Sequence, residues 1–168
     1  MRTDAMLPDL DTVSFDATLP LAVEPLTGAA TLARETRLAL RILAAPAPRE
    51  EDEAAAARLE AKLDLALEVA LMARRPHTPA LRDCRVGLDA LCWHEDAGHR
   101  HEAGEVLLVT LFPHPDSALA LELPLRIELP ADAGRACLAR LLPVFDEASR
   151  QRWERWVFRR HRLALQQR

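Results

Sequence analysis

The chain has 168 residues, of which 49% are hydrophobic and 29% are charged. This content suits one folded domain with a real core and excludes a disordered chain. The formal charge of −4 gives no overall attraction to nucleic acid. The charge is unevenly spread, because residues 149–168 carry seven Arg and one Glu, a net +6 that leaves −10 for residues 1–148.

The cysteines and the lengths of the apolar runs indicate where in the cell the protein is located. Cys84, Cys92 and Cys137 cannot all pair within one chain, and none lies in a CxxC motif. The sequence begins with no apolar run of the secretory type. Its longest uncharged stretch, 106–115, is far shorter than the ~20 residues that span a bilayer. We therefore expect a cytoplasmic protein without membrane insertion, with its three thiols reduced and buried.

The first part of the chain predicts an arm, a strand and a helix. Residues 1–12 are polar and read as a frayed arm. Residues 14–23 alternate between apolar and polar types and predict a half-buried strand, which Pro20 favours placing at a sheet edge. Residues 29–44 predict a helix. Within that helix, three basic residues at helical spacing form a stripe: Arg34, Arg37 and Arg41.

Residues 49–75 are the clearest helix of the sequence. Acidic residues begin it, Arg74 and Arg75 end it, and both placements suit the helix macrodipole. Steps of three and four residues define a heptad seam: Ala56, Leu59, Leu63, Ala66, Ala70 and Ala73. At about 40 Å the helix is longer than a small β-domain needs for cover. The seam favours self-association, with a core-covering helix as the alternative.

The second half of the chain changes to a β pattern. Four strands are predicted with short connections between them: 84–93, 105–112, 118–129 and 135–145. A basic helix over 146–167 follows, with Asp146 as its N-cap and with Trp153 and Trp156 packed on the strands. Consecutive strands of this kind indicate an antiparallel barrel or sandwich, with residues 29–75 as a helical insertion.

Three segments resemble the PilZ domain family, and most closely its tetramer-forming branch. They are SFDATLPLAVEPL with the later DLALEVALMARR, VGLDALCW with GEVLLVTLFPHPDSALALELPLRIEL, and LARLLPVFDEASRQRWERWVFRRHRLAL. The resemblance covers about residues 14–166. It implies one α+β domain over 1–168: a six-stranded antiparallel β-barrel, an inserted helical pair and a C-terminal helix.

The same resemblance implies cyclic di-GMP as a ligand. The family places an RxxxR segment just before the first strand and a [D/N]xSxxG motif on the next strand, and paired guanidinium groups suit phosphates and guanine edges. Residues 1–13 contain a single arginine, Arg2, so no arginine pair precedes the first strand. At the second motif Arg85, Gly87 and Ala90 replace the acid, the Ser and the Gly. The sequence therefore predicts a degenerate nucleotide site.

Six arginines remain as candidate ligand-binding residues: Arg159, Arg160 and Arg162 in the closing helix, and Arg34, Arg37 and Arg41 in the first. The basic closing helix is also consistent with a solvated face. No catalytic motif is present, so neither an enzyme nor a cofactor is predicted. His94, His99 and His101 share a polar loop with Glu95 and Asp96, but their spacing matches no familiar zinc motif and no metal is predicted.

These observations predict a non-catalytic bacterial signalling module. It would act as a homo-oligomeric adaptor for an unidentified protein partner, assembled through residues 49–75, and a tetramer is what the resemblance implies. The alternative is a genuine cyclic di-GMP receptor that uses the six arginines. Nucleic-acid binding is the weakest interpretation, because the remainder of the chain is acidic.

Overall fold

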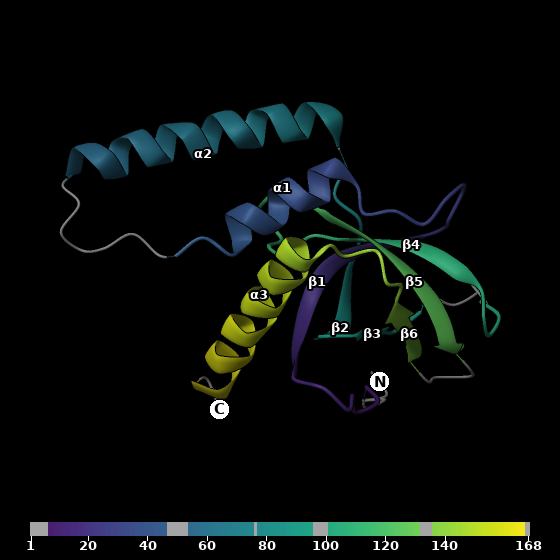
Figure 1. The fold of residues 1–168 in the computed structure, drawn as a ribbon. Coiled ribbons are helices and arrows are strands. Elements are labelled where there is room, and N and C mark those ends of the chain that lie inside the picture. Colours follow the sequence, from purple (N-terminus) through teal and green to yellow (C-terminus); the bar gives the residue numbers. More distant parts are fainter. Residues whose placement is uncertain (1–6, 47–53, 76, 96–100, 132–135, 167–168) are drawn as a thin grey trace.

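A closed barrel of six antiparallel strands forms the body of the protein in the computed structural model, which describes residues 7–46, 54–75, 77–95, 101–131 and 136–166 (Figure 1). The strands are β1 (Ser14–Pro25), β2 (Leu81–Gly87), β3 (Ala90–Trp93), β4 (Val106–Leu111), β5 (Leu121–Leu129) and β6 (Cys137–Leu141). The helices are α1 (Arg34–Leu43), α2 (Ala54–Arg74) and α3 (Glu147–Gln166). Around the barrel the strands run β1-β2-β3-β6-β5-β4. The predicted α+β architecture, with its helical pair inserted after the first strand, is confirmed.

The edge position predicted from Pro20 is wrong. β1 pairs with β2 over its first half, up to Pro20 opposite Leu81, and with β4 from Leu21 onward. Pro20 therefore stands where β1 changes partner, and its carbonyl accepts a hydrogen bond from the Phe112 amide at 3.0 Å. A residue without an N–H group interrupts the ladder least at such a point.

The single strand predicted over 84–93 is two strands, β2 and β3, joined by a tight turn at Leu88 and Asp89. Contacts from distant elements hold this turn. The Leu88 carbonyl accepts a hydrogen bond from Trp153 Nε1 at 3.0 Å, and the Asp89 carbonyl accepts one from the Leu141 amide at 2.8 Å. Apolar residues continue on both sides of the turn, so the local pattern does not reveal it.

Several element ends differ from the prediction. The helix predicted over 29–44 begins at Arg34, because Leu32 is buried in the core on an extended segment. The strand predicted from 118 begins at Leu121, since the backbone amide of Ala118 is bound by a side chain of α2. The last predicted strand, 135–145, is shorter and spans Cys137–Leu141. The acidic start predicted for the long helix lies outside the described residues.

The core fills the barrel and continues under α3. Trp153, Trp156 and Val157 are buried, and Trp156 meets Phe15 edge to face with ring centroids 5.4 Å apart. The Asp146 carboxylate accepts a hydrogen bond from the Ser149 amide at 2.8 Å, which is the predicted N-cap. The predictions that both tryptophans pack on the barrel and that Asp146 begins the helix are confirmed.

The three cysteines lie buried on β2, β3 and β6 as free thiols, as predicted. Burial raises the pKa of Cys84, Cys92 and Cys137 to about 12, so these thiols are poor nucleophiles. Within the described ranges, none of the helices is long and apolar enough to cross a bilayer.

Candidate functional sites: the outer helix and the Arg85 face

Helix α2 lies outside the barrel, along the side that carries α1 (Figure 1). Five large apolar side chains of α2 are 58–66% exposed: Leu59, Leu63, Leu65, Val69 and Met72. In the barrel, leucines such as Leu107 and Leu123 are completely buried. Exposed apolar residues in one contiguous element indicate an interaction surface.

Two apolar stripes run along α2. The first is the predicted seam, whose residues Leu59, Leu63, Ala66, Ala70 and Ala73 are all exposed. Ala56 belongs to the helix, but its side chain lies outside the described part. The second stripe is Leu65, Val69 and Met72, which the heptad analysis missed although their spacing of four and three is visible in the sequence. At ~100° per residue the two stripes lie about 110° apart around the axis.

A third face of α2 holds the helix to the rest of the chain. The Glu68 carboxylate accepts hydrogen bonds from the Ser117 hydroxyl and from the Ala118 amide, the latter at 2.8 Å. Arg75, directly after the helix, pairs with Glu122 of β5. At the end of the helix, Arg74 lies 3.1 Å from Glu35 of α1 and adds a contact outside this face. These contacts fix the C-terminal half of α2 and leave both apolar stripes facing outward.

The arginines of the closing helix have different environments. Arg159 donates hydrogen bonds to the carbonyls of Leu43, Ala44 and Ala45, at 3.1, 3.4 and 3.0 Å. It therefore caps the C-terminus of α1, and its guanidinium is engaged by backbone carbonyls of its own chain. The Arg160 guanidinium lies 5.4 Å from the Phe15 ring centroid, in cation–π geometry, while Arg162 is exposed.

The basic stripe of α1 faces solvent. Arg34, Arg37 and Arg41 are exposed, and Arg37 Nε lies 3.7 Å from the Asp146 carboxylate. Because α1 and α3 pack against each other, the six candidate arginines share one two-helix layer. Arg159 leaves this set because it binds backbone carbonyls.

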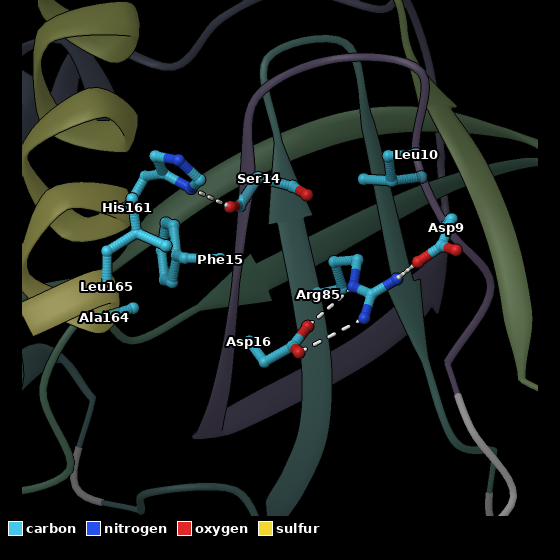
Figure 2. Close-up of a pocket in the computed structure, with 9 residues that line it drawn as sticks. All are labelled: Asp9, Leu10, Ser14, Phe15, Asp16, Arg85, His161, Ala164 and Leu165. Carbon is cyan, nitrogen blue, oxygen red and sulfur yellow. Dashed lines mark hydrogen bonds and ion pairs between the residues drawn. The ribbon is translucent and has the colours of Figure 1, made fainter. Parts of the chain in front are cut away.

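A different arginine is the centre of a polar contact network on the barrel. Arg85 lies on β2 and forms a fork with Asp16 of β1, with Nε–Oδ1 2.6 Å and Nη2–Oδ2 3.2 Å (Figure 2). Its Nη1 donates to the Pro8 carbonyl at 2.9 Å and to the Asp9 carboxylate. The hydrogen bond to Asp16 raises the pKa of Arg85 above its ordinary value. Each of the three guanidinium nitrogens therefore donates to a group of the chain itself.

The aligned nucleotide motif, residues 85–90, is therefore occupied by contacts within the chain. Beside Arg85 is a pocket of about 230 Å³, whose lining includes Phe15, Asp16 and His161 (Figure 2). His161 Nδ1 lies 2.6 Å from the Ser14 carbonyl. Asp9, Asp16 and Arg85 together carry a formal charge of −1. That charge opposes the approach of a phosphate diester.

In the polar loop that carries the candidate metal-ligating histidines, Glu95 and His101 are bound by other side chains. The Glu95 carboxylate, 4% exposed, accepts hydrogen bonds from Arg82 Nη1 at 2.7 Å and from Trp93 Nε1 at 2.9 Å. His101 lies between Glu95 and Glu105, at 3.3 and 3.4 Å. His99 and Asp96 lie outside the described part of the chain. Among the residues described, no three His, Cys, Asp or Glu side chains are arranged to hold a metal.

Comparison with known proteins places the fold. No family model and no curated protein sequence matches the chain. Among solved structures, a protein from Xanthomonas campestris matches with a TM-score of 0.73 and 24% identity, over 93% of this chain and 91% of that one. It is described as a pathogenic protein and as a new tetrameric PilZ domain self-assembled via an unusual helical bundle. The chain therefore has the fold of a PilZ domain, as its sequence predicted.

Proposed function

We propose that this protein is a non-catalytic signalling adaptor, related to the cyclic di-GMP receptors, that self-assembles through α2 and has lost the nucleotide site. The observation that carries the proposal is the pair of exposed apolar stripes on a helix held to the chain by its third face. Full burial of each large side chain contributes about 1.5–3 kcal/mol, so covering five of them is a strong drive to associate.

The two stripes also bear on the size of the assembly. One heptad seam is satisfied by a single partner helix, as in a two-stranded coiled coil. A helix that is apolar on two faces needs a neighbour on each of them, which is the situation inside a bundle. The similar Xanthomonas protein is described as a tetramer assembled via a helical bundle. We therefore propose a tetramer in which α2 from four chains forms the bundle.

The proposed loss of nucleotide binding rests on Arg85. The resemblance places the ligand-clamping arginines before the first strand, where Arg2 is the one arginine of residues 1–13. At the second motif, Arg85 stands in place of the acid and donates to two carboxylates and a carbonyl of its own chain. The exposed Arg34, Arg41 and Arg162 support the alternative of a receptor with a non-standard site. Calorimetric titration with cyclic di-GMP separates the two. We expect no heat at high ligand concentration, and micromolar binding would establish the receptor.

Cysteine cross-linking tests the assembly. We expect Ala70→Cys, in the first stripe, to give cross-linked pairs of about twice 18.7 kDa under mild oxidation. The three natural cysteines are buried and provide a silent background. The matched control is Leu129→Cys, because Leu129 is also exposed but lies on the barrel. Equal cross-linking of both variants would contradict assembly through α2.

A further inference from the structure

The described part of the arm before β1, residues 7–12, is not frayed as its composition predicted. These residues, here called the strap, run beside the β2–β3 hairpin and bend round its turn at Asp11 and Thr12 before β1 begins (Figure 2). The pairing of β1 with β2 begins only at Ser14, so the strap is not a strand of the barrel. Side-chain contacts hold it in place, and these contacts show what the surface recognises.

Arg85 recognises the first half of the strap. Its Nη1 donates to the Pro8 carbonyl at 2.9 Å, reaches the Leu7 carbonyl at 3.4 Å, and pairs with the Asp9 carboxylate. Asp16 binds the other edge of the guanidinium and so orients Nη1 towards the strap. A single nitrogen of Arg85, Nη1, thus contacts two consecutive backbone carbonyls and a carboxylate of the strap.

The second half of the strap packs against Gly87. A Cβ placed on Gly87 would lie 2.6 Å from Leu10 Cδ1 and 3.3 Å from Thr12 Oγ1. The absence of a side chain at Gly87 therefore makes the space that Leu10 occupies. On the neighbouring strand β3, Cys92 Sγ lies 3.9 Å from the Pro8 carbonyl. The surface accepts a leucine two residues after a proline, with an acidic residue between them.

The ion pair between Asp9 and Arg85 adds little to the hold on the strap. The Asp9 side chain is 92% exposed, and ion pairs at such exposure contribute little in water. We infer that the outer face of β2 around Arg85 and Gly87 is a peptide-recognition surface. In the free chain the strap occupies it, and a partner segment of the same Leu-Pro-Asp-Leu chemistry replaces the strap. The inference requires neither assembly through α2 nor a nucleotide.

Competition between strap and peptide gives the test. A tethered segment acts at an effective concentration of about the millimolar range, so the strap masks the surface from a free peptide. The probe is a fluorescent synthetic peptide of residues 7–13, titrated with full-length protein and followed by anisotropy. We expect the double variant Asp9→Ala, Leu10→Ala to bind it at least ~10-fold more tightly than the unaltered chain.

Two further substitutions in that double variant locate the binding. Arg85→Gln removes the guanidinium that donates to the strap carbonyls. Gly87→Ala keeps Arg85 but places a methyl group where Leu10 packs. Each substitution should return the affinity for the peptide to that of the unaltered chain. Arg41→Gln is the matched control, because Arg41 is exposed on α1, which packs against α3 and β5. Circular dichroism verifies folding of each variant. Equal affinity of the unaltered and double-variant proteins, or tight binding that survives both Arg85→Gln and Gly87→Ala, would overturn the inference.

Discussion

The barrel with α3 and the outer helix α2 use the same apolar residues in opposite ways. In the barrel, Leu107, Leu123 and Trp153 are fully buried within one chain. In α2, Leu63 and Val69 are each 60% exposed, and polar contacts at Glu68 and Arg75 tie the helix to the rest of the chain. The barrel buries its apolar residues within one chain, whereas in the proposed assembly α2 would bury its apolar stripes against other copies.

The largest expected effect is on the barrel side of the comparison. Trp153→Ala should lower the free energy of unfolding by about 3–5 kcal/mol, because it leaves a cavity under α3. It also removes the donor that binds the Leu88 carbonyl in the β2–β3 turn. Urea denaturation followed by circular dichroism measures the loss. A change below about 1 kcal/mol would mean that α3 is not part of the core.

A smaller effect is expected at the cap of α1. Arg159→Ala should cost about 1–3 kcal/mol, because Arg159 donates to three carbonyls at the end of that helix. The exposed Arg162 is the matched control on α3, and Arg162→Ala should change stability by less than about 0.5 kcal/mol. The same denaturation experiment compares them. Equal losses would contradict the capping role.

Acid should weaken the barrel through Glu95. Burial of Glu95 opposes its ionisation, but hydrogen bonds from Trp93 and Arg82 outweigh burial and lower its pKa below 4.5. The carboxylate therefore stabilises the fold above pH 4.5, and this contribution is lost as pH falls through the lowered pKa. Thermal unfolding between pH 6 and pH 3 should show a steeper decline for the unaltered chain than for Glu95→Gln. Parallel declines would rule out this carboxylate as the cause.

The smallest expected effect is on α2 itself. In a chain made monomeric by Leu63→Glu, Met72→Ala should change the free energy of unfolding by less than about 0.5 kcal/mol, because Met72 is exposed there. In the assembled protein the same change should weaken association measurably on dilution. Sedimentation velocity over a concentration series records the second effect. A large stability loss in the monomer would show that Met72 is part of a core within the chain.

Local patterns predicted most of the fold, and long-range contacts account for what they missed. The spacing of Leu59 and Leu63 predicted the long helix because periodicity is a property of consecutive residues. The turn at Leu88 is held by Trp153, 65 residues away, and this contact leaves no trace in the local sequence. The heptad spacing predicts one stripe of α2 and leaves out Leu65 and Val69, because a heptad pattern describes a single seam.

The candidate sites were less predictable than the fold. Arg159 was proposed as a ligand residue from its position in a basic helix, but its partners are carbonyls of α1, which only the tertiary structure brings near. Arg85 was seen only as a departure from a motif. Its contacts with Asp9 and Pro8 depend on the path of residues 7–12, which polar composition alone does not specify.

Sedimentation equilibrium of the unaltered chain, Leu63→Glu and Leu129→Glu tests the central claim most directly. Leu63 and Leu129 are similarly exposed, at 60% and 56%, so the two substitutions differ mainly in their location on α2 or on the barrel. We predict about four times 18.7 kDa for the unaltered chain and for Leu129→Glu, and a single 18.7 kDa mass for Leu63→Glu with its barrel still folded. An unchanged mass for Leu63→Glu would contradict assembly through α2.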